Sequence, residues 1–515
     1  MTLRHVLHVG NILNNGYLHC KYLRRRGVMA ESLNVDYTHC QGQPEWNEVR
    51  ITQPVAHFDQ DWSQIDVGEF QRPAWYHGLS CGDLPELADR MAGDGGNRPP
   101  AEPVDTPTES LRGRIGRAAI GHRAAPLRRA VSAGLSALGM HQTASRLREM
   151  INLARLAGEP DQGRALKEFA TTVIADYDRL LPDAPTPLTV QDVLDHIGRA
   201  RMHAPVFSHF PLIQGYSLDP IHPLLGTPGK PFICYEHGTM REFPYEDSAR
   251  GRLYRLALKK AEKVFITNVD CIASAKRLEL DNWVFIPHLI DDDHFHPGES
   301  PIRQELLERL DCDHLILCPA RHHWRHSPDA NPNSWFKAND VLIRGIAKFM
   351  ANRPEIRASV IFFEWGMEVD LSKALIAELG IADRVHWEPI RSKLCMLDFY
   401  RAADVICDQF HPGLASFGAV VPEGLACGKP VISNLNHETH SWGFPVLPPV
   451  VHAPDDEAVA KSLETLFDDE ETRAQVGIAG LAWFRQHHSS NLVIGRMIEV
   501  YHELSDRHGW GWRFD

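Results

Sequence analysis

Short apolar runs alternate with longer helical patterns through much of the chain. The first run covers residues 5–9, leads into a loop rich in Gly and Asn at residues 10–16, and is followed by a helical pattern to Arg26. A second apolar run begins after Gly27. Apolar runs of strand length separated by helical patterns are typical of parallel strands joined by helices. The beginning of the chain therefore predicts a β-α-β unit.

The strand pattern then returns in two series. In the first, strands are expected in APVFSHFP, KPFICYEHG, AEKVFITN and WVFIPH, within residues 204–288. In the second, which begins at His314, strands are expected in HLILCPAR, SVIFFEWG, RVHWEPI, ADVICDQF, KPVISN and FPVLPPVV. Together the two series predict an α/β protein with two Rossmann-like, doubly wound parallel sheets.

A mostly helical insertion is expected at about residues 83–203 of the first domain, because helical patterns replace the strands there. Within it, residues 93–108 (GDGGNRPPAEPVDTPT) are rich in Gly and Pro and read as a flexible linker. We expect a first domain at residues 1–290, a linker at 291–312 and a second domain at 313–480. The helix at 481–515 is expected to return to the first domain.

Composition narrows the class of protein. A chain of 515 residues exceeds one hydrophobic core, and its net charge of −13 argues against general nucleic-acid binding. No apolar window is long enough to span a bilayer, and His5 and His8 interrupt the first run, so it reads as a buried strand rather than a signal peptide. Ten cysteines without a Cys-x-x-Cys pair indicate free thiols and a cytoplasmic location.

An arginine-rich segment within the insertion changes the local charge. Between residues 111 and 150 eight arginines face one acid, Glu149, and apolar residues recur at helical spacing. Such a segment is able to lie on an anionic membrane surface, to hold an anionic acceptor, or to pack on its own domain with a solvated face. The arginines of the proposed membrane contact are Arg112, Arg114, Arg117, Arg123, Arg128 and Arg129.

The most informative segment is VICDQFHPGLASFGAVVPEGLACGKPVIS, residues 405–433. An apolar strand runs into a loop with Phe417-Gly418, then Glu423 opens a short helix, and Gly428 to Pro430 break it before the next strand. Loops of this kind lie at the carboxyl ends of parallel strands, where α/β sheets bind ligands. A carboxylate there is able to accept hydrogen bonds from two adjacent hydroxyls of a ligand.

This segment resembles the nucleotide-sugar-binding segment of family 4 (group 1) glycosyltransferases, which have the GT-B fold. The residues that match are Phe417, Gly418, Glu423, Gly428 and Pro430, while Ala415 replaces the family's first Glu. Ile286-Pro287 and Phe295-x-Pro297 also resemble the family's crossover between the two domains. The resemblance implies that Glu423 holds the ribose of a nucleotide-sugar donor. Because the family's first Glu contacts the donor sugar, Ala415 leaves the identity of that sugar open.

The resemblance also implies roles for residues outside this segment. Arg321, after a strand, and Lys337, at the opening of a helix, correspond to the cations that bind the donor diphosphate. His237 corresponds to a histidine that contacts the donor sugar, and Glu236, Arg241 and Glu242 are expected beside it. Asn14, Asn15 and Gly16 form the small-residue loop that lets substrate come close.

Metal binding is a weaker interpretation. His322, His323 and His326, the acids Asp291, Asp292 and Asp293, and His294 and His296 lack the paired spacing of a structural zinc site. The acidic run lies in the expected linker, where we expect it to be solvated. No metal and no cofactor is expected, and the resemblance implies metal-independent transfer with retention.

The expected function is that of a glycosyltransferase, a hexosyltransferase using a UDP- or GDP-sugar. The acceptor would be a glycan, as in polysaccharide biosynthesis, a lipid-linked intermediate or a small molecule, with the protein cytoplasmic or peripheral at the inner face of the membrane. Two alternatives remain open, a sugar-nucleotide epimerase of the same fold and a non-catalytic module that binds a glycan or a partner.

Overall fold

The computed structural model describes residues 4–53, 55, 65–93, 160–325, 336–411 and 417–515. The chain divides into two compact units. Unit 1 comprises Met1–Arg4, Leu79–Pro211 and Ile221–Lys230, and unit 2 comprises His5–Gly78, Leu212–Pro220 and Pro231–Asp515. Both sheets lie almost entirely in unit 2, so this unit carries all of the predicted site residues.

The first sheet has seven strands in the order β3-β2-β1-β4-β5-β6-β7. Every pair from β2 to β7 is parallel, and the chain order reverses between β1 and β4. Such a reversal is the point at which doubly wound sheets bind ligands. The strands are β1 Val6–Val9, β2 Ala30–Val35, β3 Tyr76–Leu79, β4 Leu212–Tyr216, β5 Phe232–Tyr235, β6 Lys263–Ile266 and β7 Trp283–Phe285.

Helices connect the strands of this first sheet. They are α1 Asn15–Arg25, α2 Pro44–Glu48, α9 Ala249–Lys260 and α10 Cys271–Arg277, with 3-10 turns at Ile12–Asn14, Cys40–Gly42, Thr239–Arg241 and Phe243–Tyr245. α9 begins where the Ser248 side chain accepts a hydrogen bond from Gly251 N–H, which satisfies one of the free amides of its first turn.

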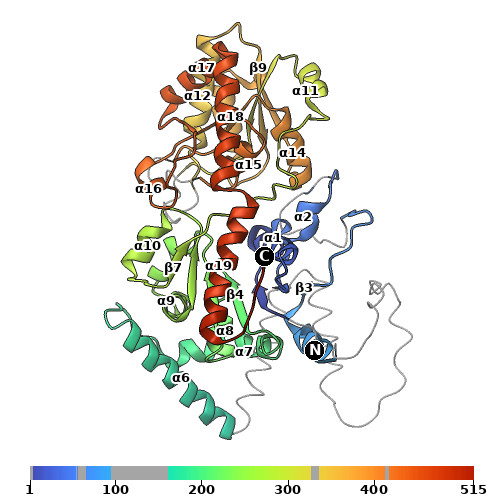
Figure 1. Cartoon of the computed structure of the whole chain (residues 1–515). Coiled ribbons are helices and arrows are strands. Elements are labelled where there is room, and N and C mark those ends of the chain that lie inside the picture. Colours follow the sequence, from blue (N-terminus) through green and yellow to red (C-terminus); the bar gives the residue numbers. More distant parts are fainter. Residues whose placement is uncertain (1–3, 54, 56–64, 94–159, 326–335, 412–416) are drawn as a thin grey trace, which may run out of the picture. The chain divides into compact units, whose positions relative to one another are not determined.

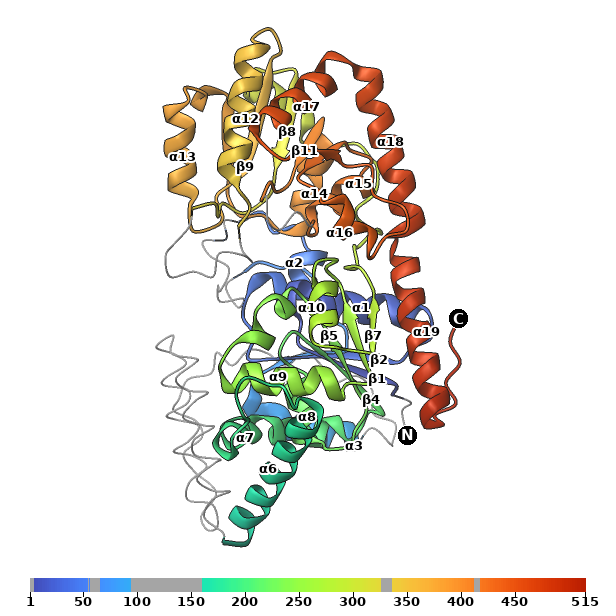
Figure 2. The ribbon, with the colours of Figure 1, turned by 90° about the vertical axis from the view of Figure 1, so that its left-hand side faces the viewer.

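The second sheet has six parallel strands in the order β10-β9-β8-β11-β12-β13. They are β8 His314–Cys318, β9 Ala358–Phe363, β10 Val385–Glu388, β11 Val405–Cys407, β12 Val431–Ser433 and β13 Val451–His452. Its helices are α11 Arg303–Arg309, α12 Asn339–Asn352, α13 Val369–Glu378, α14 Lys393–Ala402, α15 Val420–Ala426, α16 His437–Ser441 and α17 Asp456–Asp468. Figure 2 shows α12 and α18 on opposite sides of this sheet.

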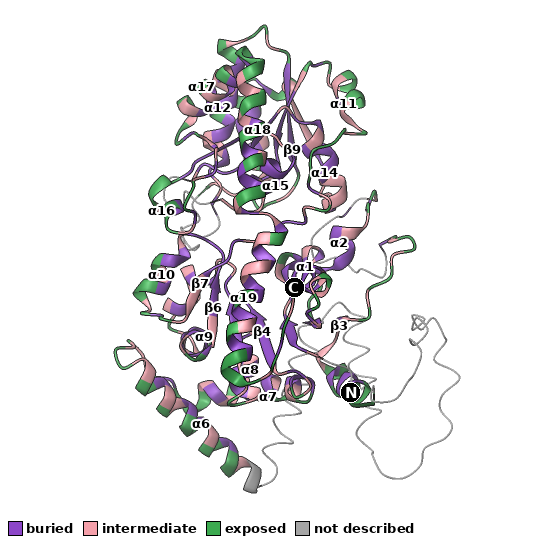
Figure 3. Cartoon of the chain, in the orientation of Figure 1, coloured by how far each residue is buried: buried purple, intermediate pink, exposed green. Residues whose placement is uncertain are grey.

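Two long helices end the chain. α18 Glu470–His487 packs against α15, and α19 Ser490–His508 packs against α1. Val493, Met497 and Tyr501 of α19 belong to the same apolar core as Val6 and Leu212 of the first sheet. The central strands of both sheets, such as β1, β4, β5, β8, β9 and β11, are buried along almost their whole length (Figure 3), which explains why they read as continuous apolar runs.

Unit 1 is helical in its described part. It contains α3 Leu84–Gly93, α6 Pro160–Leu180, α7 Val190–Phe207 and α8 Ile221–Gly226, with a 3-10 turn at Cys81–Asp83. Thr189 and Asp192 form a capping box at the start of α7, and α7 packs closely on α8, where a Cβ at Gly226 would lie 2.3 Å from the Ala200 carbonyl oxygen.

The prediction of two parallel doubly wound sheets is confirmed, but two expected strands are wrong. The first half of APVFSHFP, residues 204–207, belongs to α7, which continues through Pro205, and the strand of this region is β4, which begins directly after the segment. FPVLPPVV contributes only Val451 to β13. The Gly/Pro linker after Gly93 and the segment with Arg112 to Arg129 lie outside the described residues, and the domain boundaries stay a prediction.

No helix among the described ones is long and apolar enough to cross a bilayer.

A buried hydrogen-bond network joins α19 to the first sheet. Tyr501 Oη donates to Gln214 Oε1 at 2.8 Å, and Gln214 Nε2 donates to Tyr216 Oη at 3.0 Å. His8 Nδ1 and His19 Nδ1 both lie 2.6 Å from Tyr216 Oη. Burial is the main reason that the pKa values of both imidazoles are lowered, to about 3 for His19. The network is therefore made of neutral groups.

Replacing Tyr501 with phenylalanine removes the donor that satisfies buried Gln214 Oε1. We expect Y501F to lower the free energy of unfolding by about 1–2 kcal/mol, measured by guanidinium denaturation. The matched control is Y245F, because the buried Tyr245 hydroxyl has no hydrogen-bond partner among the described residues. Equal stability of Y501F and Y245F would contradict a stabilising role for the network.

Candidate functional site

The first loop of the chain places Asn14, Asn15 and Gly16 at the start of α1. Asn14 is left-handed (φ 59°), and its Nδ2 donates to Gln43 O at 2.5 Å and to Asn47 Oδ1 at 2.9 Å. Gly16 lies in the first turn of α1, where a Cβ would be 2.5 Å from the Gly10 carbonyl oxygen. Only glycine fits there. In this structure the group that comes close to Gly16 is therefore the backbone of the loop itself.

Asn15, the first residue of α1, connects this loop to His237. Its Nδ2 lies 2.8 Å from the Ile12 carbonyl oxygen and 3.3 Å from His237 Nδ1. His237 comes two residues after β5 and is half-buried. Burial, and secondly the charge of Arg241, lower the pKa of His237 to about 4, so its imidazole is neutral at pH 7.

The residues around His237 are held by a buried carboxylate. Glu236 accepts hydrogen bonds from the backbone N–H of Gly238 and, at 3.2 Å, from that of Thr267. Gly238 has a φ of +81°, and a Cβ there would meet the Arg241 guanidinium. Arg241 in turn forms a two-pronged ion pair with Asp270, at 2.6 and 2.9 Å. Glu236 and Arg241 are thus fixed close to His237, and a shared substrate cleft with Glu242 stays a prediction.

The two predicted diphosphate ligands lie at the second sheet. Arg321 comes three residues after β8, and burial lowers the pKa of its guanidinium to about 10. Lys337 precedes α12 by two residues, so the expectation that it opens the helix is wrong. Ala338, which lies between Lys337 and the helix, has a φ of +51°, and this left-handed turn separates Lys337 from the helical amides.

Lys337 contacts a pair of residues that the sequence analysis treated only as the end of a strand. Its Nζ donates to Gln409 Oε1 at 2.5 Å, and its carbonyl oxygen accepts from Phe410 N–H at 2.9 Å. Asp408, the residue after β11, is buried, and its Oδ2 has no hydrogen-bond partner among the described residues. The position of Asp408 directly after a buried strand was the signal available in the sequence.

Electrostatic coupling shows that these charges lie close together. The pKa of Lys337 is lowered to about 8, chiefly by burial and then by the charges of Arg321 and Arg241, while the charge of Asp408 opposes this shift. Burial raises the pKa of Asp408 to about 6, with Lys337 lowering and Glu423 raising it. These influences place Lys337 near Arg321, Arg241 and Asp408, and Asp408 near Glu423, and Arg241 also acts on the pKa of His237.

Glu423 is fixed in α15 with its side chain buried. Its Oε2 accepts a hydrogen bond from Tyr400 Oη at 2.8 Å, and its Oε1 pairs with the ammonium group of Lys393. Both partners come from α14. Sequence reasoning missed them because they lie 23 and 30 residues away from Glu423 and belong to no local motif.

The Phe417-Gly418 pair is at the edge of the described loop, and Ala415 lies outside the described residues. The Phe417 ring stacks on His440 with a centroid distance of 4.9 Å and lies 5.8 Å from Phe444. A Cβ at Gly418 would meet no described atom within 4 Å. Among the described residues, no hydrogen bond, ion pair or ring contact joins Phe417 or Gly418 to Glu423, and their predicted role at the nucleotide stays a prediction.

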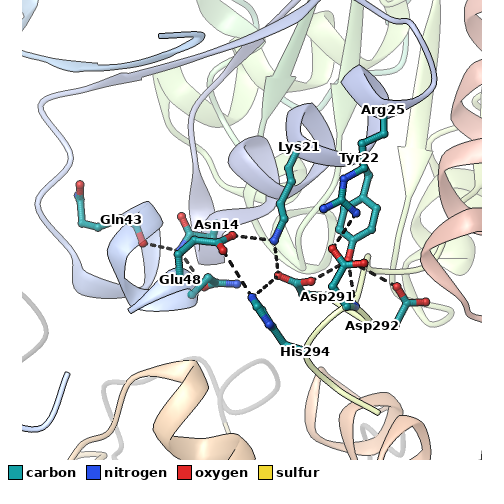
Figure 4. Close-up of polar contacts among 11 residues, drawn as sticks. Asn14, Lys21, Tyr22, Arg25, Gln43, Glu48, Asp291, Asp292 and His294 are labelled. Carbon is teal, nitrogen blue, oxygen red and sulfur yellow. Dashed lines mark hydrogen bonds and ion pairs between the residues drawn. The ribbon is translucent and has the colours of Figure 1, made fainter. Parts of the chain in front are cut away.

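A second polar cluster, drawn in Figure 4, lies around Lys21 of α1. Lys21 Nζ donates to Glu48 Oε1 at 2.8 Å and to Asp291 Oδ2 at 3.1 Å, and Tyr22 Oη donates to Asp291 Oδ1 at 2.7 Å. Asp291 is buried, so the expectation that the acidic run is solvated is wrong for this residue.

Glu48, Asp291 and His294 present ligand atoms within 4.8 Å of one another, as a metal site requires. The Lys21 ammonium already bonds both carboxylates and supplies the positive charge that a cation would bring. Burial raises the pKa of Glu48, but hydrogen bonds from His294 and Lys21 outweigh it and lower that pKa to about 2. We interpret the cluster as an ion-pair network that holds α1 against the segment after β7.

Comparison with known proteins found relatives for part of the chain. No protein-family model matches it. Over 182 residues the chain is 34% identical to a D-inositol 3-phosphate glycosyltransferase of Thermobispora bispora, a match that covers 33% of this chain and 41% of that protein. Over 102 residues it is 38% identical to the protein of the same name from Rhodococcus jostii, covering 19% and 22%. The chain thus spans less than half the length of these curated relatives.

Among solved structures, the Anabaena protein Alr3699/HepE in complex with UDP and glucose aligns with a TM-score of 0.48 and 16% identity, over 59% of this chain and 81% of that chain. The sucrose-phosphate synthase of Thermosynechococcus elongatus aligns with a TM-score of 0.47 and 18% identity, over 61% and 79%. The curated relatives are named glycosyltransferases, and over about a third of its length this chain is similar to them, which is consistent with a group 1 glycosyltransferase.

Proposed function

We propose that the protein transfers a sugar from a nucleotide-sugar donor to a hydroxyl acceptor. The observation that carries the proposal is the grouping of Arg321, Lys337 and Glu423 near the carboxyl edge of the second sheet. Asp408 interacts electrostatically with both Lys337 and Glu423, and Arg321 interacts with Lys337. A leaving diphosphate needs fixed cations, and a ribose needs an acceptor for its two hydroxyls. These residues supply both.

In this proposal Arg321 and Lys337 bind the donor diphosphate and Glu423 accepts hydrogen bonds from the ribose. His237 contacts the sugar or a phosphate oxygen, with Arg241 beside it. Because the cations of Arg321 and Lys337 are already present, the charge that develops on the leaving phosphate is stabilised without a metal. Transfer with retention follows from the resemblance to family 4 enzymes.

The acceptor is proposed only by class. A glycan, a lipid-linked intermediate or a small polyol fits the resemblance, and the name of the curated relatives adds an inositol phosphate to the acceptors worth trying. Peripheral contact with an anionic membrane through Arg112 to Arg129 stays a prediction from the sequence.

The proposal is tested by incubating the protein with UDP- and GDP-sugars in the presence of EDTA. We expect slow release of UDP or GDP without an acceptor, and faster release with one. Binding of the donor without any turnover would favour the non-catalytic module, and isomerised sugar nucleotides would favour the epimerase. Turnover that depends wholly on an added divalent cation would contradict the metal-independent mechanism.

Removal of the carboxylate of Glu423 should weaken the binding of the nucleoside diphosphate. We expect E423Q to raise the Kd for UDP or GDP, whichever binds, about tenfold, because one charged acceptor of the ribose hydroxyls is lost. Isothermal titration calorimetry measures the change.

The control for E423Q is D404N. Asp404 is a carboxylate with fixed partners too, paired with Arg303 and with Leu315 N–H at 2.8 Å, but it is half-buried and lies at the amino end of β11, the end opposite Asp408. D404N should cost stability and leave the Kd of the nucleotide unchanged. If both variants weaken binding equally, Glu423 acts only through the stability of the second sheet.

Lys337 should give nucleotide binding a pH dependence. Its pKa is lowered to about 8, so the ammonium that attracts a diphosphate is present below pH 8 and is lost as the pH rises above it. We expect the Kd for UDP to rise above pH 8, approaching tenfold per pH unit, because the bound diphosphate favours the protonated amine.

The variant K337R keeps a positive charge through this range and should flatten the profile between pH 7 and 9.5. Calorimetry at each pH compares the two proteins. A wild-type Kd that is constant over this range would remove Lys337 from the diphosphate site.

A further inference from the structure

The orientation of the Asn15 amide follows from what its neighbours are able to accept. Asn15 Nδ2 lies 2.8 Å from the Ile12 carbonyl oxygen, an atom that only accepts hydrogen bonds. On the other side Tyr235 Oη, which is able to donate, lies 3.5 Å from Asn15 Oδ1. The Ile12 carbonyl requires the NH₂ group where it stands, and the Tyr235 hydroxyl is able to donate to the Oδ1 of that orientation, so the amide is not free to turn over.

The second hydrogen of this NH₂ group faces His237. Asn15 Nδ2 lies 3.3 Å from His237 Nδ1, and an amide nitrogen donates but does not accept. His237 Nδ1 must therefore be the unprotonated nitrogen of the ring. Since the pKa of His237 is lowered to about 4 by burial and by Arg241, the ring is neutral at pH 7 and carries one proton. That proton is on Nε2.

The neighbours of the His237 ring also limit the positions that the ring is able to adopt. It packs edge-on against His288 with a centroid distance of 4.6 Å, and His288 is neutral because burial lowers its pKa. The backbone after His237 is held where Glu236 binds Gly238 and Thr267 N–H. The tautomer and the ring plane are thus both determined by groups that surround His237 in unit 2.

We propose that Asn15 is a positioning residue that keeps His237 as the Nε2–H tautomer, so that the imidazole donates a hydrogen bond to an oxygen of the donor substrate. The assignment of the acceptor as a phosphate or sugar oxygen rests on the proposed function. A neutral donor stabilises negative charge that develops on oxygen and adds no net charge next to Arg241. The conservative change N15D reverses this arrangement, because a carboxylate accepts only.

The test reads the tautomer directly by nitrogen-15 NMR of protein labelled at histidine, with the His237 signals assigned by their loss in H237Q. In the free wild-type protein we expect Nδ1 to have the shift of an unprotonated nitrogen and Nε2 that of a protonated one. In N15D we expect the two to exchange or the ring to become doubly protonated. A protonated Nδ1 in the neutral wild-type ring would overturn the proposal, whatever the activity of the protein.

Kinetics of donor hydrolysis supply the second readout. For N15D we expect kcat to fall on the order of 10- to 100-fold with a smaller change in KM, because the lost hydrogen bond strengthens as charge develops. A changed tautomer with unchanged kcat would overturn the positioning role. If N15D does not fold, N15A replaces it, and loss of the single tautomer, with both nitrogens partly protonated, is the expected result.

The matched control is N282D. Asn282 Nδ2 donates to the carbonyl oxygens of Leu258 and Ala261, at 3.1 and 2.6 Å, so this variant also sets a carboxylate against backbone carbonyls. It should lose stability and leave the His237 signals unchanged. A wild-type Nε2–H tautomer in a protein that hydrolyses no nucleotide sugar would refute the proposed function but not the tautomer assignment.

Discussion

Positive charge that is partly withdrawn from water near the carboxyl edge of the second sheet is the constraint on which the candidate site depends. Lys337 is placed where burial and two guanidinium groups, those of Arg321 and Arg241, disfavour its charged form, while the charge of Asp408 favours it. Removing a charge from water is costly unless a partner compensates. The ammonium of Lys337 is therefore compensated only in part in the free protein. A ligand that carries several negative charges would stabilise it most.

Fixed neighbours hold several of the charged side chains of the candidate site in place. Glu423 is held by Tyr400 and Lys393 from the neighbouring helix, so it does not have to be ordered when a ligand binds. Arg241 is held in the same way by Asp270. Groups fixed before binding cost less entropy on binding than mobile ones do. The arrangement is therefore that of a preformed site rather than of scattered surface charges.

The fold was predictable where the burial of an element produces a clear apolar pattern in the sequence. Strands such as β8 and β9 are covered on both faces and read as continuous apolar runs. The apolar run at residues 204–211 was wrongly predicted to be a strand. Helix α7 continues through Pro205 and buries Val206 and Phe207, which are apolar residues typical of strands. A short apolar run does not by itself distinguish a buried strand from the buried end of a helix.

The site was predictable only in its local part. Glu423 stands in a recognisable loop and helix, whereas its partners Lys393 and Tyr400, and the pairing of Lys337 with Gln409, join segments that only the fold brings together. Asp408 was passed over because a polar residue after an apolar run reads as the end of a strand. Strand order within the sheet, which pattern alone does not give, decides which strand ends become neighbours.

The two polar clusters of α1 act on the same helix from different points. Asn15 begins α1, and Lys21 follows six residues later, about 9 Å along the axis at 1.5 Å per residue. Lys21 and Tyr22 are bonded to Asp291 and Glu48, so the ion-pair network limits sliding or rotation of the helix. A contact of 3.3 Å between Asn15 and His237 tolerates little movement. The burial of Asp291 thus has a physical reason: it fixes the helix whose first residue orients the histidine.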